Sequence, residues 1–346
     1  MKEQHPKKKI VLIIACSVLA FILIVLLAAG MIIKDLLSDI NRVEDNGPTL
    51  SSEEIDIILN QPDDNQEEFS GPELNENDVV TPTEPAAKIE DNANINILLV
   101  GQDRLKGTAR TRSDAMILVT INKSSKTLTM TSFMRDLWVQ IPGYYKQRLN
   151  VPYLIDKVNG FDLLNKTLDY NFGVSADHNV EVDFSGFSAA IDAVGGVDIV
   201  LTGAEARHLN DQEGWTLIEG SNHLTGDQAL AYSRIRKIGS DFQRTSRQRT
   251  VLTALIEKAK SLSLAELYAM TKSVLPLITT DMTDKDILNY VIELTRILPE
   301  LKIVSQRIPV DGAYYNANIG GRQVLCLTEE DWKTNIQILK ETFGND

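Results

Sequence analysis

The sequence predicts one folded domain of layered α/β class, a central mixed β-sheet flanked by helices. Three observations support this class. Short apolar runs typical of buried strands are interleaved with amphipathic helical segments along residues 94–346. These runs are numerous enough to build a layered core, and the sequence has no internal repeat. The chain of 346 residues has room for such a domain and for preceding segments.

The N-terminal segments predict attachment to a membrane. Residues 1–9 end in three lysines, and residues 10–33 form an apolar run without a single charge. In a helix that rises about 1.5 Å per residue, this run reaches roughly 36 Å, enough to cross a hydrocarbon core of about 30 Å. Because the lysines come first, we expect a cytoplasmic tail, a single-pass signal-anchor helix and an extracellular remainder.

Two other interpretations of the apolar run are less consistent with its length. A cleaved signal peptide usually has an apolar region of about 7–15 residues, which is shorter than this run. Lipidation at Cys16 would leave only a handful of apolar residues before the modified cysteine, and the run continues well past it. An uncleaved anchor is therefore the prediction.

Residues 34–93 are predicted to form an acidic, disordered extracellular linker. Within residues 41–91, fifteen acidic residues stand against two basic ones, a net charge of −13 that equals the net charge of the whole chain. Low hydrophobicity, dense like charge and repeated prolines are typical of a self-repelling tether. A helix over residues 51–60 would be marginal alone. The domain at 94–346 is therefore close to neutral, and the acidity says little about its partner.

The predicted elements of the domain follow from local periodicity and end signals. Strands are expected at residues 95–100, 115–121, 127–133, 138–141, 178–183 and 302–310. Helices are expected at residues 156–170, 184–194, 241–262, 263–277 and 283–298, with a closing helix from about residue 328.

An arginine-rich stretch, residues 226–249, is the most informative part of the sequence. It contains Arg234, Arg236, Arg244, Arg247 and Arg249. A capping-box pattern at residues 225–228 predicts a short helix, which places the first two arginines at its end or just beyond. A second helix from about residue 241 would put Arg244, Arg247 and Gln248 on one face. Grouped guanidinium groups suit a phosphate or pyrophosphate, although a solvated basic face is the ordinary alternative.

Acidic residues accompany this stretch at the ends of predicted strands. Asp103 follows the first strand and Asp114 precedes the second. Two carboxylates at one sheet edge can share a cation such as Mg²⁺, although each alone is also explained as a turn residue. Arg135 and Asp136 end the third strand, where a surface ion pair is the default explanation.

Other functions lack support in the residue pattern. The four histidines and two cysteines show no zinc-ligand spacing, and Cys326 has no disulfide partner outside the membrane. No Gly-x-Ser-x-Gly elbow indicates a serine hydrolase. Nucleic acid is not expected as a partner, because the basic stretch is predicted to lie outside the cell behind an acidic linker.

Taken together and in order, the motifs resemble the LytR-CpsA-Psr family of membrane-anchored cell-wall enzymes. The matching pieces are residues 96–103, 112–114, 132–143, 148–150, 182–187, 192–198, 226–236 and 241–248. The resemblance covers roughly residues 94–260. Beyond that range, residues 311–321 still look like the closing pair of strands of such domains. It implies an enzyme of a Gram-positive-type envelope that takes a glycopolymer (teichoic acid, capsule or similar) from a polyprenyl-pyrophosphate lipid. It also implies transfer of that polymer, as a phosphodiester, to peptidoglycan.

The resemblance also implies site residues, each matched by position in this sequence. Asp103 and Asp114 match the acids that hold Mg²⁺, with Mn²⁺ as an alternative ion. The candidates for binding the pyrophosphate are Arg112, Arg135, Arg234, Arg236, Arg244, Arg247 and Gln248. The catalytic candidates are Arg135, Asp136, Arg234, Arg236 and Asp241.

Several questions stay open at the level of sequence. Asp136 or Asp241 could orient an arginine or accept the acceptor's proton. A polyprenyl chain needs an apolar tunnel, and residues 184–194 could line it, although ordinary core is the preferred explanation. Met134 replaces a usual proline, Arg148 replaces a usual lysine, and the glycine-rich continuation after Asn150 is absent. Hydrolysis of the lipid pyrophosphate, or a non-catalytic regulator of the envelope, are the alternative functions.

Overall fold

The structure, a computed structural model, describes residues 37–38, 40–42, 51–60, 71–89, 94–102, 112–156 and 159–343. Within these ranges no helix has both the length and the apolarity that a membrane crossing requires. The predicted tail and anchor, residues 1–33, lie outside them, and so does Asp103. One compact unit, residues 41–346, contains all the elements of the fold.

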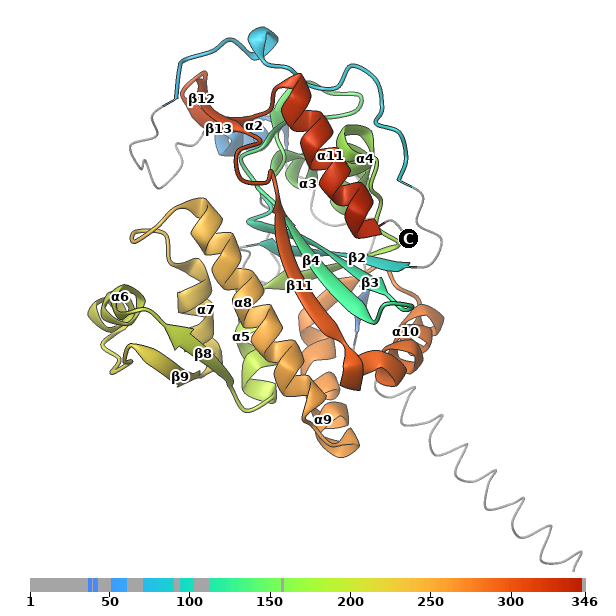
Figure 1. The fold of residues 1–346 in the computed structure, drawn as a ribbon, viewed down its shortest axis with the longest axis vertical. Coiled ribbons are helices and arrows are strands. Elements are labelled where there is room, and N and C mark those ends of the chain that lie inside the picture. Colours follow the sequence, from blue (N-terminus) through green and yellow to red (C-terminus); the bar gives the residue numbers. More distant parts are fainter. Residues whose placement is uncertain are drawn as a thin grey trace, which may run out of the picture. The chain divides into compact units, whose positions relative to one another are not determined.

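A mixed β-sheet forms the centre of this unit (Figure 1). Among the described residues, its seven strands run in the order β1-β10-β7-β2-β3-β4-β11. Their bounds are β1 Asn41–Arg42, β2 Asn94–Gln102, β3 Ala115–Asn122, β4 Thr127–Phe133, β7 His178–Asp183, β10 Ile278–Thr280 and β11 Lys302–Ile308. Strands β2, β3 and β4 form an antiparallel meander. Strand β7 adds parallel to β2, and β11 adds parallel to β4. The predicted mixed α/β class is confirmed.

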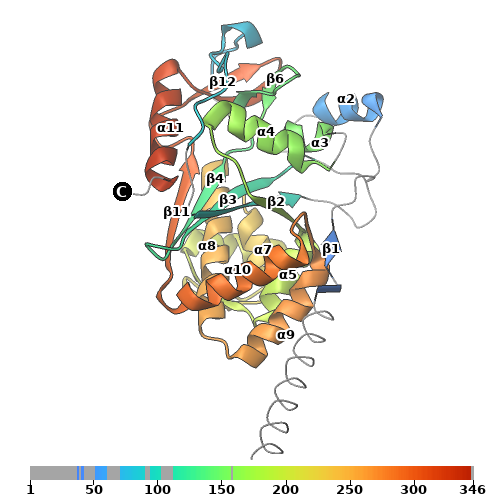
Figure 2. The same ribbon diagram turned by 90° about the vertical axis from the view of Figure 1, so that its right-hand side faces the viewer.

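Helices cover both faces of the sheet (Figure 2). One face carries α3 (Val151–Ile155), α4 (Phe161–Phe172) and α11 (Glu329–Phe343). The opposite face carries α5 (Phe184–Ala193), α7 (Gly226–Arg234), α8 (Asp241–Lys260), α9 (Leu264–Val274) and α10 (Asp284–Ile297). Strands buried on both faces read as continuous apolar runs, which explains the run in β3.

Alternate residues of the central strands serve the two faces. Val100 and Met116 belong to the core with α4 and α11, whereas Ile117 belongs to the core with α8 and α10. The cross-strand pairs follow the same alternation, since Val100 pairs with Met116 and Gly101 pairs with Ala115. This period of two is what the pleat of a β-strand dictates.

A lobe beside the sheet was not predicted. It consists of α6 (Gly203–Glu213) and the hairpin of β8 (Val197–Leu201) and β9 (Gly220–Leu224), next to α7 (Figure 1). The signal for α6 was present, because Thr202 and Glu205 form a reciprocal capping box at its start. The hairpin buries alternate residues of β8 in a separate apolar core with α5 and α7.

Several predicted boundaries differ from the structure. The helix expected at 156–170 begins at Phe161, because Asn159 Oδ1 accepts hydrogen bonds from Phe161 N and Asp162 N. The strand expected at 138–141 is β5 (Trp138–Gln140), which pairs with β6 (Lys146–Arg148) in a ribbon outside the main sheet. The expected closing strand pair is β12 (Tyr315–Ile319) with β13 (Arg322–Cys326).

Part of the predicted disordered linker packs on the domain. The helix considered at 51–60 is α2 (Ser52–Asn60), and Glu76–Asp78 form a short 3-10 helix. Leu74 N donates to Asn318 O at 2.8 Å, and Ile89 N donates to Gly173 O at 2.8 Å. Val79 is 2 % exposed. Residues 71–89 are therefore folded, because a few apolar side chains and backbone hydrogen bonds anchor a segment whose composition alone indicated disorder.

Candidate functional site

A cavity of about 980 Å³ lies between the sheet and helices α5, α6, α7 and α8. Its charged and polar lining comprises Arg112, Asp114, Arg135, Asn150, Asp183, His208, Gln212, Glu213, Asp227, Ser233, Arg234, Arg236, Lys237, Arg244 and Gln248. Its apolar lining includes Leu99, Ile117, Phe184, Phe187, Leu209, Trp215, Leu230, Ala231 and Leu252. All the sequence-predicted arginines except Arg247 thus share one cavity with an extensive apolar wall.

The two kinds of lining are separated along the elements. Arg112 and Asp114 precede β3, whereas Ile117 lies within it, deeper in the sheet. On α8, Arg244 lies in the first turn and Leu252 two turns further on, on the same side of the helix. The cavity is therefore cationic near the strand ends and apolar toward the middle of the sheet.

Asp114 is the centre of the charged end. Its Oδ1 lies 3.1 Å from Arg135 Nη1 and 3.5 Å from Arg236 Nη2. Its backbone N donates to Gly101 O at 2.8 Å, which fixes it beside the end of β2. Arg236 reaches this point because α7 ends at Arg234, so Arg236 lies just beyond the helix, as the capping box at Thr225 predicts.

Two further carboxylates, those of Asp136 and Asp241, hold the arginines in place. Arg135 Nε lies 3.3 Å from Asp136 Oδ2 and 3.7 Å from Asp241 Oδ1. Asp136 Oδ1 lies 3.5 Å from Nη1 of Arg148, which is 1 % exposed. Asp241 Oδ1 and Oδ2 accept from Arg244 at 2.7 Å and 3.1 Å. Neither Asp136 nor Asp241 is among the described residues that line the cavity.

The electrostatics of this cluster favour an anion. Burial and the neighbouring guanidiniums of Arg135 and Arg244 lower the pKa of Arg236. Burial opposes the ionisation of Asp241, yet the guanidiniums of Arg244 and Arg135 hold its pKa below the ordinary value. The arginines therefore crowd one another, and a bound polyanion would relieve that repulsion through charge-assisted hydrogen bonds.

Two further candidates line the same end. Arg234 lies with its Cζ 4.3 Å from the centroid of the Phe184 ring, a stacked arrangement that orients the guanidinium. Gln248 lies one turn beyond Arg244, and its Oε1 is buried without a hydrogen-bond partner in the described part of the chain. An orphaned acceptor inside a cavity indicates a site for a ligand donor or water.

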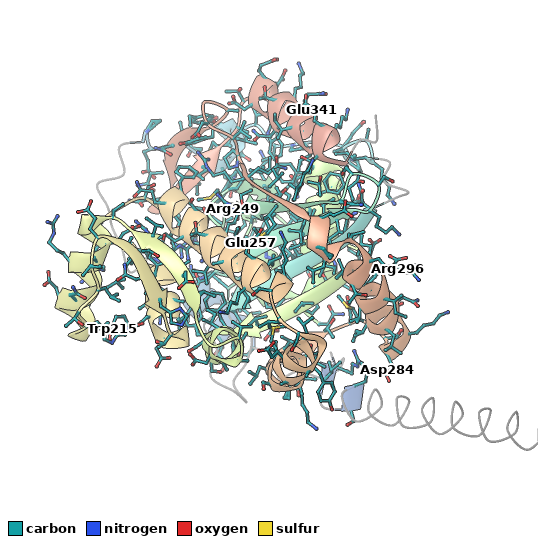
Figure 3. All side chains as sticks on the ribbon, turned by 60° about the horizontal axis from the view of Figure 1, so that its bottom comes forward. Trp215, Arg249, Glu257, Asp284, Arg296 and Glu341 are labelled. Carbon is teal, nitrogen blue, oxygen red and sulfur yellow. The ribbon has the colours of Figure 1, made fainter. Side chains whose placement is uncertain are left out.

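Arg247 does not share the face predicted for it. Its Nε lies 2.7 Å from Glu205 Oε1, its Nη1 donates to Ile235 O at 3.0 Å, and it is absent from the described cavity lining. A helix turns 100° per residue, so the position three residues after Arg244 diverges far enough to meet α6 instead. Arg249 also points elsewhere, donating to Ser132 Oγ at 2.7 Å; Figure 3 labels it on α8.

The metal assignment has one described member. Asp103 lies outside the described residues, and it follows Gln102, the last residue of β2, in the sequence. Asp114 is bound beside Gly101, near that strand end. Within the described ranges no group of three or more His, Cys, Asp or Glu side chains could hold a metal ion. The fit for a divalent ion therefore depends on a carboxylate next to β2, which Asp103 would supply.

The apolar wall modifies the expectation for α5. Phe184 and Phe187 line the cavity, whereas Ile191 on the same helix is fully buried in the core with the lobe. Helix α5 therefore serves both purposes, and the preferred explanation of the whole segment as ordinary core holds only for its second half. Trp215, at the edge of the lobe (Figure 3), also lines the cavity and was not predicted.

The fold and the cavity together define an α/β protein in which a large cavity joins guanidinium groups to an apolar wall. The family model described as the LytR_cpsA_psr family matches residues 59–341, and the chain belongs to this family. The match begins within the segment that composition alone assigned to a linker, in agreement with the packing of residues 71–89.

Two curated relatives are transferases by name. The chain is 35% identical over 189 residues to "Polyisoprenyl-teichoic acid--peptidoglycan teichoic acid transferase TagU" of Bacillus mycoides (strain KBAB4), covering 53% of this chain and 58% of that protein. It is 34% identical over 180 residues to the TagT transferase of Bacillus subtilis (strain 168), covering 50% of this chain and 55% of that protein. The chain thus matches little more than half the length of these relatives.

Solved structures are similar over a longer range. "TagT bound to LIIa-WTA" has a TM-score of 0.62 and 27% identity, covering 77% of this chain and 100% of that one. "LytR-CPS2A-psr family protein YwtF (TagT) with bound octaprenyl pyrophosphate lipid" has a TM-score of 0.57 and 25% identity, covering 77% and 96%. The second of these proteins binds a lipid that combines a pyrophosphate with a long apolar chain.

Proposed function

We propose that this chain is a transferase that moves a glycopolymer from a polyprenyl-pyrophosphate lipid to peptidoglycan, through a phosphodiester. Teichoic acid, capsule or a similar glycan would be the polymer. The observation that carries the proposal is the single cavity, about 980 Å³, in which clustered arginines and an apolar wall adjoin. A pyrophosphate on a polyprenyl chain has the same two parts in the same order.

The described side chains suggest how the donor would be held. Arg135 and Arg236 meet at Asp114, and Arg244 is braced by Asp241. Planar guanidiniums bind phosphate oxygens in pairs and neutralise their charge. Phosphoryl transfer needs mainly positioning and charge stabilisation from protein, which such a cluster supplies. The prenyl chain would extend from there along the apolar wall.

A divalent cation, Mg²⁺ or Mn²⁺, is part of the proposal. Asp103 and Asp114 would hold it, and it would supply charge neutralisation on the bridging phosphates. The contacts of Asp114 with Arg135 and Arg236 leave its second oxygen, Oδ2, as the atom to offer such an ion. The guanidiniums would act on the remaining phosphate oxygens.

The roles of Asp136 and Asp241 are proposed to be in positioning. Each is paired with two arginines, Asp136 with Arg135 and Arg148, and Asp241 with Arg244 and Arg135. A carboxylate whose pKa is lowered by such pairing, as for Asp241, is a poor proton acceptor. Holding Arg135 in place is the chemistry that these contacts favour.

The compartment follows from the sequence and remains part of the proposal. The apolar run at residues 10–33 would anchor the chain in the cell membrane with its N-terminus in the cytoplasm. The domain would then act outside the cell, where peptidoglycan and the headgroups of lipid-linked glycans meet. No nucleic-acid partner is proposed.

The test uses the full chain in detergent with a short-chain prenyl-pyrophosphate glycan, peptidoglycan oligomers and Mg²⁺. Mass spectrometry would detect a phosphate-linked glycan on the oligomer, with and without EDTA, and with Asp103→Ala. We expect an adduct that EDTA and the variant both suppress. Free glycan phosphate without an adduct would instead indicate a hydrolase. Tight donor binding with no turnover would indicate a non-catalytic regulator of the envelope.

A further inference from the structure

Asn150 carries an unused hydrogen-bond acceptor inside the cavity. The residue is 3 % exposed and lines the cavity near its charged end. Its Oδ1 is shielded from solvent and has no hydrogen-bond partner in the described part of the chain. Buried polar atoms are nearly always bonded in native proteins, so an orphan of this kind indicates a ligand group or an ordered water.

The local backbone gives this side chain no structural role. Asn150 directly precedes α3, a position at which asparagine usually accepts a hydrogen bond from the helix backbone. No such bond is made, and one of the two usual donor positions is Pro152, which has no N–H. The amide therefore forgoes the capping interaction, in a residue that lines the cavity.

The backbone of Asn150 fixes this side chain next to the reacting groups. Asn150 N donates to Arg135 O at 3.2 Å, and Ser113 N donates to Asn150 O at 3.4 Å. Asn150 thus connects the chain segment that carries Arg135 with the segment that carries Asp114. Both of those residues lie at the point where the pyrophosphate is proposed to bind.

We infer that Asn150 Oδ1 accepts a hydrogen bond from the incoming hydroxyl of the acceptor glycan and orients its oxygen toward the phosphorus. This inference rests on the proposed transfer and deepens it. Phosphate oxygens have no hydrogen to offer, so an amide oxygen beside them needs a donor from another group. The carboxylates of Asp114, Asp136 and Asp241 each have at least one oxygen engaged by a guanidinium.

The chemistry assigns Asn150 no proton. The acceptor oxygen forms a bond to the phosphorus that carries the glycan, and the bond from that phosphorus to the polyprenyl phosphate breaks. The bonding pair leaves with polyprenyl phosphate, which also takes up the hydroxyl proton, directly or through water. A neutral amide is not basic enough to take that proton, so Asn150 contributes direction and proximity to the attack.

Two variants and one control test the assignment in the full chain in detergent. Asn150→Ala removes the hydrogen-bond acceptor atom. Asn150→Asp keeps an acceptor of the same shape but removes the N–H donors and adds a negative charge. Asn318→Ala is the matched control, because Asn318 Oδ1 is also a buried orphan but belongs to β12 and is absent from the described cavity lining. Circular dichroism melts would verify that each variant folds.

Calorimetry would measure the binding of a peptidoglycan oligomer to the protein saturated with a prenyl pyrophosphate. This ligand carries no glycan, so binding is measured without transfer. We expect Asn150→Ala to weaken binding of the peptidoglycan oligomer about 2- to 10-fold, the scale of one neutral hydrogen bond. Prenyl-pyrophosphate affinity should stay within about twofold of the wild type. Asn150→Asp should restore acceptor affinity, and Asn318→Ala should match the wild type.

Three outcomes would overturn the assignment. Unchanged acceptor affinity in Asn150→Ala would remove the hydroxyl contact. An equal loss of prenyl-pyrophosphate affinity in Asn150→Ala would mean that the amide donates to phosphate instead. If the oligomer does not bind the wild type saturated with prenyl pyrophosphate, the proposed binding site for the acceptor glycan is wrong. A wild type that binds the oligomer yet forms no adduct would overturn the proposed transferase activity and leave the Asn150 contact standing.

Discussion

The two faces of the central sheet are built from the same strands and reach opposite results. Toward α4 and α11, the side chains of Leu98, Val100, Met116 and Leu118 pack into a continuous apolar core and are at most 1 % exposed. Toward α5, α7 and α8, the intervening residues of the same strands line a cavity of about 980 Å³. One face is packed throughout, and the other combines a packed core against α8 and α10 with space for a ligand.

The difference comes from side-chain size at a few alternating positions. Gly101 and Ala115 form a cross-strand pair that faces the cavity, next to the pair of Leu99 and Ile117. A Cβ on Gly101 would come within 3.2 Å of the Ala115 Cβ, so a side chain at position 101 would crowd the space between these two strands. Small residues at the charged end thus leave room where the arginines meet. Protein interiors are close-packed, so a cavity of this size lowers the packing density. We therefore attribute the cavity to the need for a ligand site.

The comparison predicts that one variant on each face changes either stability or ligand affinity but not both, and these are the largest effects expected. Leu118→Ala on the solid face should lower the free energy of unfolding by about 2–5 kcal/mol and leave ligand affinity unchanged in the folded fraction. Ala231→Phe on α7 fills the cavity side and should change stability by less than about 1.5 kcal/mol, while weakening prenyl-pyrophosphate binding at least about tenfold. Urea unfolding and calorimetric titration measure the two properties separately.

The opposite pattern would break the distinction between the faces. If Ala231→Phe unfolds the protein, the space near α7 is too tightly packed to accept a chain. If it folds and binds normally, the apolar wall there is not the lipid site. Leu98→Ala, on the solid face and outside the described cavity lining, is a second control and should resemble Leu118→Ala.

Arg135→Ala should have the next largest effect, and only on the cavity side. Arg135 contacts Asp114, Asp136 and Asp241, so its removal leaves three carboxylates with one guanidinium fewer between them. We expect transfer to fall about 100- to 1000-fold, the scale for losing one preorganised donor at developing charge. Arg207→Ala, an exposed arginine on α6, should keep full activity in the same mass-spectrometric assay.

A loss of stability that matches the loss of activity would contradict a site role for Arg135. Melts of the folded variants distinguish the two causes. A variant that binds prenyl pyrophosphate normally but fails to transfer would place the contribution of Arg135 in the transition state.

Most of the secondary structure could be predicted because it follows local rules. The capping box at Thr225 set the start of α7, and the strand β7 has the bounds that its alternation indicates. The mixed sheet and its flanking helices follow from buried runs interleaved with amphipathic segments. The convergence of Arg135, Arg234, Arg236 and Asp114 was expected through family resemblance, since the residues are far apart in sequence.

What could not be predicted depends on contacts between distant segments. Arg247 was assigned to the site from helical spacing, but its partner Glu205 lies 42 residues away on α6, a helix that had not been identified. The packing of residues 71–89 depends on β12 and α4, which composition cannot reveal. The absence of a capping hydrogen bond from the Asn150 side chain likewise becomes visible only when the surrounding atoms are known in three dimensions.

The pair of Glu205 and Arg247 gives the smallest predicted effect and a way to separate ionic support on the cavity side from apolar packing on the solid face. Burial opposes the charge of Glu205, yet Arg247 and the capping contact with Thr202 hold the pKa of its carboxyl below the ordinary 4.5. A carboxyl whose pKa is lowered in the folded state contributes stability above its unfolded pKa, and that contribution is lost as pH falls through the folded pKa.

We expect Glu205→Gln to lower the free energy of unfolding by about 1.5–3 kcal/mol at pH 7, with this gap to the wild type shrinking below about pH 4.5. Urea unfolding from pH 7 to pH 3 measures this gap. The gap for Leu118→Ala should stay constant over the same range, because its surroundings are apolar. A Glu205→Gln gap that also stays constant would mean that hydrogen bonding and packing, and not the carboxylate charge, hold α6 against α8.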